Sequence, residues 1–164
     1  MLEQSFGVKG NMLNKICFLA DKNNKKAQEL RKKLSLKYKE IPYQEAEAIV
    51  AIGGDGFMLE VIHQNFDKPI YGVNLGSIGF LMNLFQEKED LLLKINNSQE
   101  IIFNPLKIKA ETIDGEKLEK LAFNEFSLLR ASHQAAQIKI SVEKKVKIEK
   151  LICDGLIIST PAGS

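Results

Sequence analysis

Residues 15–98 alternate short apolar runs with stretches in which apolar residues recur at helical spacing. Three runs have the length and bulk of buried strands: KICFLA (15–20), AEAIVAIGG (46–54) and KPIYGVNL (68–75). Between them, residues 21–38 and the stretch that follows the glycines at 53–56 have the apolar spacing of helices. Strand, helix, strand, helix, strand predicts a parallel sheet with helices on its faces.

The ends of the helices are also predicted from short patterns. Asp21 or Asn23 is expected to cap the first helix, because both side chains are good N-caps. A further helix is expected over 86–98, where QEKEDLLLKI is followed by an Asn-Asn-Ser breaker.

From Ile101 onward the pattern becomes that of antiparallel strands. The runs at 101–113 and 116–130 flank Asp114-Gly115, a strong hairpin signal. The run at 135–160 alternates Ile and Val with Lys and Glu, as half-buried strands do. We therefore predict an α/β N-terminal domain with a parallel sheet over 1–100. The first part of an all-β, sandwich-like domain follows over 101–164, and the stop at Ser164 leaves it incomplete, as in a truncated protein.

Composition excludes several classes of protein. Lys and Arg outnumber Asp and Glu by only 23 to 21, which gives no electrostatic argument for a nucleic-acid partner. No apolar run approaches the length that spans a membrane, and no signal-peptide segment is present, so a cytoplasmic location is expected. Cys17 and Cys153 lie far apart in apolar runs and are expected to be buried, reduced thiols. His63 and His133 are expected at the surface.

The segment AIGGDGF (51–57) is the strongest candidate for a site. Glycines between a strand and a helix let backbone N–H groups converge on a phosphate at the positive end of the helix. The spacing matches neither a Walker loop nor GxGxxG. Asp55 makes chemical sense there if it orients a hydroxyl, accepts its proton or helps to hold a divalent cation. The alternative is a simple turn in which Asp55 caps the helix.

Three further segments carry polar residues where apolar ones prevail. A second glycine string at 72–83 is expected at the same carboxyl edge of the sheet as the first. Asn124 and Glu125 interrupt an apolar strand, and a buried pair of this kind needs polar partners. Asp154-Gly155 leads into a strand that ends in TPAGS (160–164), where small residues permit close approach of a flat ligand or form only a turn.

Together, GGDG, GVNLGSIGFL, FNE and DGLIISTPAGS resemble the motifs of NAD kinases in their order and approximate spacing. The resemblance covers nearly the whole chain from Lys15. GGDG alone is shared with phosphofructokinases and with diacylglycerol and sphingosine kinases. The later motifs narrow the choice of family to the NAD kinases. Departures are Phe57, Leu75 and Ala162, where many members carry threonine, arginine and threonine.

The resemblance implies ATP-dependent phosphorylation of the 2′-hydroxyl of the adenosine ribose of NAD, with a divalent cation, most commonly Mg²⁺. Asp55 matches the catalytic aspartate, and the phosphate- and ATP-facing glycines match Gly53, Gly54 and Gly56. The NAD-binding residues match Asp55, Gly56, Asn124, Glu125, Asp154 and Ala162; no residue of this chain matches a metal ligand. The family forms homodimers or homotetramers, and some members accept polyphosphate. The choice of donor and of NAD or NADH stays open.

Two other functions remain as alternatives. A lipid kinase of the diacylglycerol or sphingosine type shares GGDG but leaves the FNE and TPAGS segments unexplained. A non-catalytic nucleotide-binding fragment is the other, because the family's motif continues beyond Ser164. Residues 1–164 alone are expected to bind NAD weakly and to turn it over poorly.

Overall fold

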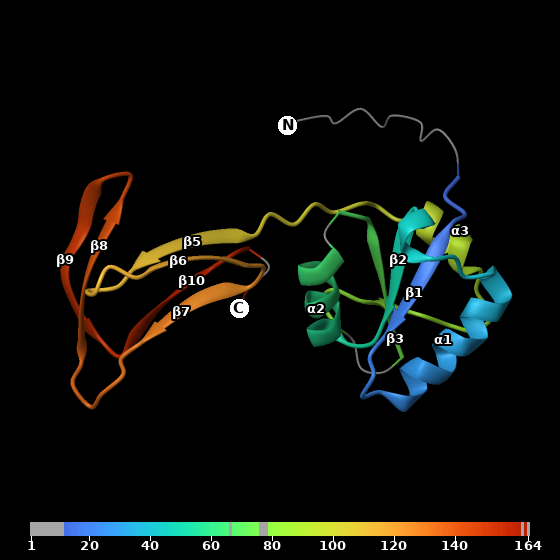
Figure 1. The fold of residues 1–164 in the computed structure, drawn as a ribbon, viewed down its shortest axis with the longest axis horizontal. Helices are drawn as coiled ribbons and strands as arrows, with labels where there is room; N and C mark the ends of the chain where they lie inside the picture. The colour runs from blue at the N-terminus through green and yellow to red at the C-terminus, as the bar shows by residue number, and fades with distance from the viewer. Residues whose placement is uncertain (1–11, 66, 76–78, 162, 164) are drawn as a thin grey trace. The chain divides into compact units, whose positions relative to one another are not determined.

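The computed structural model describes residues 12–65, 67–75, 79–161 and 163 (Figure 1). The chain divides into two compact units, Met1–Glu100 and Ile101–Ser164, and each is described by itself. The first unit contains β1 (Ile16–Ala20), α1 (Lys25–Tyr38), a 3₁₀ turn η1 (Tyr43–Glu45), β2 (Ala48–Ile52), α2 (Asp55–Asn65), β3 (Ile70–Asn74), β4 (Asn83–Leu84) and α3 (Leu91–Asn96).

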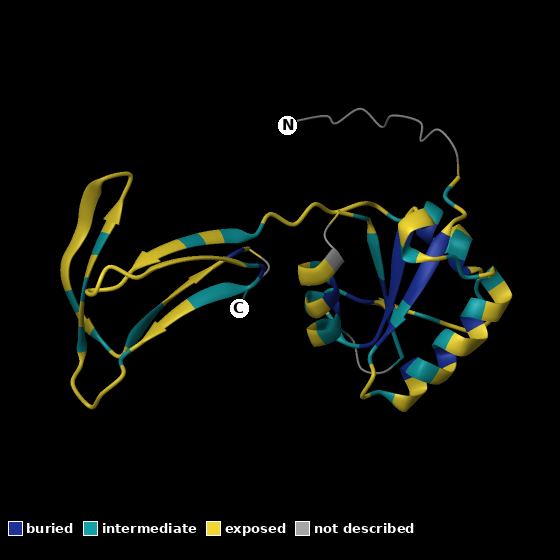
Figure 2. Cartoon of the chain, viewed as in Figure 1, coloured by how far each residue is buried: buried dark blue, intermediate teal, exposed yellow. Residues whose placement is uncertain are grey.

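The four strands of the first unit form one parallel sheet in the order β1-β2-β3-β4, which confirms the predicted parallel sheet. Every residue of β2 is buried, as its continuous apolar run requires for a central strand covered on both faces. Figure 2 shows the buried residues concentrated in β1 and β2. Each fully buried aliphatic side chain contributes about 2 kcal/mol to the free energy of unfolding.

Alternation along the strands divides the core into two layers. Ile16 and Phe18 of β1 pack in one cluster with α1 and α3, whereas Cys17 packs in a second cluster with α2. Successive strand residues point to opposite faces, so α1 and α3 cover one face of the sheet and α2 covers the other. Burial raises the pKa of the Cys17 thiol, and the nearby Glu40 carboxylate adds to that shift.

Three details of the first unit differ from the predictions. Neither Asp21 nor Asn23 caps α1; the side chain of Asn24 accepts a hydrogen bond from the Ala27 amide at 3.2 Å. The last helix begins only after Asp90, which caps it, because residues 87–88 form a turn. The short strand β4 was not predicted, since two residues carry no periodicity.

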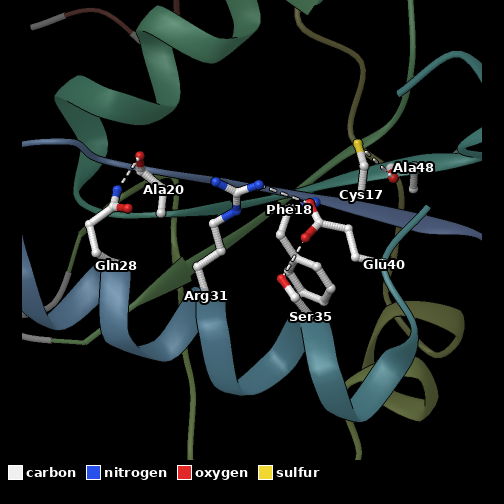
Figure 3. Close-up of polar contacts among 8 residues, drawn as sticks. All are labelled: Cys17, Phe18, Ala20, Gln28, Arg31, Ser35, Glu40 and Ala48. Atoms are coloured by element: carbon white, nitrogen blue, oxygen red, sulfur yellow. Dashed lines mark hydrogen bonds and ion pairs between the residues drawn. The ribbon is translucent and has the colours of Figure 1, made fainter. Parts of the chain in front are cut away.

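Glu40 closes the outer edge of β1 (Figure 3). Its Oε1 accepts hydrogen bonds from the Phe18 amide at 3.1 Å and from Arg31 Nη2 at 3.2 Å. The Ser35 hydroxyl donates to Oε2 at 2.5 Å. The neighbouring Ile41 amide donates to the Ile16 carbonyl at 3.2 Å. The carboxylate therefore satisfies polar groups of an edge strand and of α1, and the next residue adds a backbone bond to the same strand.

The second unit contains six strands in three antiparallel pairs. They are β5 (Leu106–Glu111) with β6 (Lys117–Ala122), β7 (Glu125–Leu129) with β10 (Gly155–Ser159), and β8 (Ala136–Val142) with β9 (Lys145–Cys153). The hairpin at Asp114-Gly115 is confirmed, and Gly115 has the positive φ of 82° that favours glycine there. Packing of these pairs into a sandwich stays a prediction.

The strands of the second unit are more exposed than the half-buried strands that were predicted. Nearly all of β9 is exposed, including apolar residues such as Val146 and Ile152. Phe123 is the buried apolar residue of this unit within the described part of the chain. Apolar and charged residues do alternate along these strands, but most residues on both faces of the β8–β9 pair are exposed or only partly buried.

Two smaller predictions also have outcomes. Both cysteines are free, with Cys17 buried and Cys153 half-buried. Both histidines are exposed, as expected. Among the described residues, the helices are too short or too polar to cross a bilayer.

Candidate functional site

The carboxyl ends of three neighbouring strands meet at one edge of the parallel sheet. Ile52 of β2 is in register with Ala20 of β1 and with Val73 of β3. The Asp21 amide donates to the Ile52 carbonyl and the Gly53 amide to the Val73 carbonyl, each at 3.0 Å. The loops after these strands therefore start side by side, where open α/β sheets place their ligands.

The three glycines of the GGDG loop differ in what surrounds them. A Cβ added to Gly53 would lie 2.7 Å from Cδ1 of Phe57, so this position is closed by packing. Within the described part of the chain, a Cβ added to Gly54 or Gly56 would meet nothing within 4 Å. The Gly54 carbonyl accepts the Met58 amide at 3.0 Å and so begins α2. Open backbone at the start of a helix of 11 residues suits an anion such as phosphate.

The Asp55 carboxylate is held by a distant part of the chain. Its Oδ2 accepts a hydrogen bond from the Phe80 amide at 2.8 Å, and its Oδ1 accepts one from the Leu81 amide at 3.2 Å. These partners belong to the second glycine string, 25 and 26 residues further along the chain. Asp55 is the first residue of α2, and a simple helix cap does not account for these two bonds.

The predicted meeting of the two glycine strings is thus found in part. Gly79 lies against the Asp55 carboxylate, and Asn74 is the last residue of β3 at the same edge of the sheet. Gly76 and Ser77 lie outside the described residues. A carboxylate oxygen has two lone pairs, so each oxygen of Asp55 keeps acceptor capacity after one amide bond.

In the second unit, the FNE segment lies beside Thr160 and Gly163 of the TPAGS segment. Ser159 of β10 pairs with Glu125 of β7. Beyond this pair, the Thr160 amide donates to the Asn124 carbonyl at 2.8 Å, and its hydroxyl donates to the Phe123 carbonyl at 2.7 Å. A Cβ on Gly163 would lie 2.4 Å from the Asn124 carbonyl oxygen, so Gly163 lies close against the backbone of Asn124.

The Glu125 side chain carries an unusual polar atom. Its Oε2 is buried and has no hydrogen-bond partner within the part of the chain that the structure describes. A buried carboxylate oxygen without a donor is costly, and such atoms call for an explanation, for example a ligand.

Asp154 lies at the other end of the β7–β10 pair. It precedes Gly155, which is in register with Leu129, four residues along β7 from Glu125, or about 14 Å. Its carboxylate accepts a hydrogen bond from Arg130 Nε at 2.7 Å, and its carbonyl accepts the Arg130 amide at 2.9 Å. Asp154 is thus separated from Asn124 and Glu125 by the length of the strand. Ala162 lies outside the described residues.

The sequence did not reveal the residues that hold these side chains. The amides of Phe80 and Leu81 have no sequence signal, because any residue except proline supplies an N–H. Arg130 and Thr160 become partners of Asp154 and Asn124 only through the antiparallel register of β7 and β10. The sequence placed the second glycine string at the same edge of the sheet as the first, but it did not identify a contact with Asp55.

Comparison with known proteins gives a family. A model of the ATP-NAD kinase N-terminal domain matches residues 8–99, which are most of the first unit. An NAD kinase of Cereibacter sphaeroides is 49% identical over 140 residues, covering 84% of this chain and 55% of the relative. An NAD kinase of Xylella fastidiosa is 43% identical over 152 residues, covering 92% of this chain and 58% of the relative.

These alignments are longer than the first unit and so extend into the second. The chain spans somewhat more than half the length of the curated relatives that it matches. The family model alone covers more than half of the chain. On this evidence, the chain belongs to the NAD kinase family.

Proposed function

We propose that the protein acts as an NAD kinase, which transfers the γ-phosphoryl group of ATP to the 2′-hydroxyl of the adenosine ribose of NAD. The products are NADP and ADP. The relatives at 43–49% identity carry this name, and they extend well beyond the region matched. The observation that carries the proposal is the Asp55 carboxylate, held in place beside open backbone at the start of α2.

The first unit would supply the donor side of the reaction. Gly53, Gly54 and Gly56 would face the phosphates of ATP, where open space at Gly54 and Gly56 lets the backbone approach them. Asp55, together with Gly56, would contact the ribose of NAD. The Asp55 carboxylate would orient the 2′-hydroxyl and accept its proton as the oxygen attacks the γ-phosphorus. Phosphoryl transfer depends mainly on such positioning.

The second unit would bind the rest of the dinucleotide. We assign Asn124, Glu125, Asp154 and Ala162 to NAD binding. Glu125 Oε2 is the best supported of these, because a ligand hydroxyl or amine would satisfy a buried oxygen that has no donor among the described residues. The domain assignment follows: residues 1–100 form the domain that carries GGDG, and 101–164 belong to the NAD-binding β domain.

A divalent cation fits this chain as part of the nucleotide substrate. The described residues hold no group of three or more His, Cys, Asp or Glu side chains that could form a metal cage. Mg²⁺ commonly binds through one or two carboxylates and the substrate phosphates. We therefore treat Mg²⁺–ATP as the substrate. By analogy with the family, we propose a cytoplasmic homodimer or homotetramer.

The test is NADP formation from ATP, Mg²⁺ and NAD. We expect NADP to form, only slowly where residues 1–164 are assayed alone, and Asp55→Asn to lower kcat by about 10²- to 10⁴-fold, because the variant lacks the proton acceptor. Leu36→Ala, on the exposed side of α1, is the control and should keep the wild-type rate. An Asp55→Asn variant with full activity would remove the role of the carboxylate.

The alternatives predict different products in the same assay. Phosphorylation of diacylglycerol or sphingosine without NADP would indicate a lipid kinase. Binding of NAD or ATP without turnover would indicate a non-catalytic nucleotide-binding protein.

A further inference from the structure

We propose that Gly79, Phe80 and Leu81 form a positioning segment that sets the orientation of the Asp55 carboxylate. The absence of a side chain at Gly79 leaves space for the carboxylate, and the amides of Phe80 and Leu81 donate hydrogen bonds to it. This inference rests on the proposed function of Asp55 and goes beyond it, because it assigns a role to residues that do not themselves react. Each residue of the segment contacts the carboxylate in a different way.

Two consecutive backbone amides donate hydrogen bonds to the two oxygens of the Asp55 carboxylate. The distances are 2.8 Å from the Phe80 nitrogen to Oδ2 and 3.2 Å from the Leu81 nitrogen to Oδ1. Two donors on separate oxygens restrain rotation of the carboxylate about the Cβ–Cγ bond, which one donor would not do. The Phe80 side chain is fully exposed, so it adds no buried packing that would hold the segment in place.

The carboxylate fits beside position 79 because glycine has no side chain. A Cβ there would lie 2.3 Å from Oδ1, 2.9 Å from Cγ and 3.1 Å from Oδ2 of Asp55. The first two distances are too short for real contacts and the third is tight, and all three atoms belong to the carboxyl group.

The contacts at Gly79 also show which group would have to move. The three nearest heavy atoms to a Cβ at position 79 all belong to the Asp55 carboxyl group, the far end of a side chain. By contrast, a Cβ at Gly155 would lie 2.1 Å from the carbonyl oxygen of Leu128, so the backbone itself would have to move.

An alanine at position 79 should therefore displace the carboxylate and leave the fold intact. The carboxyl group is the mobile end of the Asp55 side chain, and rotation about the Cα–Cβ bond would move Cγ and both oxygens away from the added Cβ without a change in the sheet. Rotation breaks the alignment of Oδ1 and Oδ2 with the two amides. The reacting hydroxyl would then meet a carboxylate in the wrong orientation, while the other residues assigned to NAD and ATP binding stay in place.

The kinetic test uses the whole protein and compares Gly79→Ala with the wild type. We expect kcat to fall by about 10²-fold, as for a misplaced catalytic group, with the KM values for NAD and ATP within a few-fold of wild type. The thermal midpoint should stay near that of the Leu36→Ala control. A rise in KM with unchanged kcat would overturn the proposal, because it would show that Gly79 contributes to binding.

A double-mutant cycle tests whether Gly79 acts through Asp55. In an Asp55→Ala background the carboxylate is gone, and Gly79→Ala should lower the residual rate no further. An additional loss equal to that of the single variant would overturn the proposal.

A third measurement does not depend on activity. The amide proton resonances of Phe80 and Leu81 should lie downfield in the wild type and move upfield both in Asp55→Ala and in Gly79→Ala. Unchanged resonances in Asp55→Ala would overturn the proposal even if Gly79→Ala fails to fold. A wild type that makes no NADP would overturn the proposed function, and the amide resonances would still decide whether the segment holds Asp55.

Discussion

At the scale of single residues, Glu40 shows how polar groups support this fold. Burial by itself would raise the pKa of the Glu40 carboxyl. Hydrogen bonds from the Ser35 hydroxyl, the Phe18 amide and Arg31 outweigh that effect, so the pKa lies below its ordinary value. The folded state thus binds the proton of Glu40 less tightly than the unfolded chain does.

A lowered pKa stabilises the fold above the ordinary carboxyl value, and this stabilisation is lost as the pH falls through the lowered value. We expect Glu40→Gln to reduce the free energy of unfolding at pH 7 by about 2 kcal/mol, because charge-assisted hydrogen bonds are lost. It should also flatten the acid limb of the stability profile below about pH 4.5. Urea unfolding from pH 3 to pH 7 measures both effects.

Glu87→Gln is the matched control for this experiment. Glu87 forms an ion pair with Lys33 in which both side chains are about two-thirds exposed. Exposed pairs of this kind contribute little, so the unfolding free energy should change by less than about 0.5 kcal/mol. An equal effect of the two variants would contradict the role assigned to the Glu40 network.

At the scale of elements, α1 provides a test of the cap that the sequence did not identify. Asn24→Ala removes the acceptor of the Ala27 amide and should lower the free energy of unfolding by about 1 kcal/mol. Asn23→Ala should cost much less, because its contact with the Asp21 carboxylate uses the backbone amide, which alanine keeps. Thermal unfolding of the two variants side by side distinguishes them.

The same helix shows what sequence reasoning can and cannot predict here. The strands β1, β2 and β3 were predictable, because continuous apolar runs follow from burial on both faces of the sheet. The choice of Asn24 as the cap of α1 was not predictable, since DKNN contains three candidate caps and backbone geometry decides among them. The glycine loop and Asp55 were singled out from the local sequence, because three glycines and an aspartate follow an apolar run, and their role in a site stays a proposal. The hydrogen bonds from the Phe80 and Leu81 amides to Asp55 form through a tertiary contact that no sequence pattern predicts.

At the scale of the whole molecule, burial is distributed unequally. The buried apolar residues lie in Met1–Glu100, apart from Phe123, within the described part of the chain. Open strand pairs with little buried apolar surface are expected to open locally at low cost.

Hydrogen exchange should therefore separate the two units. We expect amides of β1, β2 and β3 to exchange slowly and amides of β5, β8 and β9 to exchange at least about 10²-fold faster, measured on residues 1–164 at neutral pH. Amides of β7 and β10 near Phe123 and Thr160 should lie between these extremes, because both side chains are buried. Equal protection throughout would contradict this distribution of stability.

The closed edge of β1 also has a consequence for assembly. In an open sheet, a border strand with unpaired backbone groups invites strands from other molecules to add to it. The Phe18 amide and the Ile16 carbonyl on this border are already bonded to Glu40 and Ile41. Growth of the sheet by a foreign strand is thereby blocked on the β1 side. The opposite border of the sheet is formed by the two-residue strand β4.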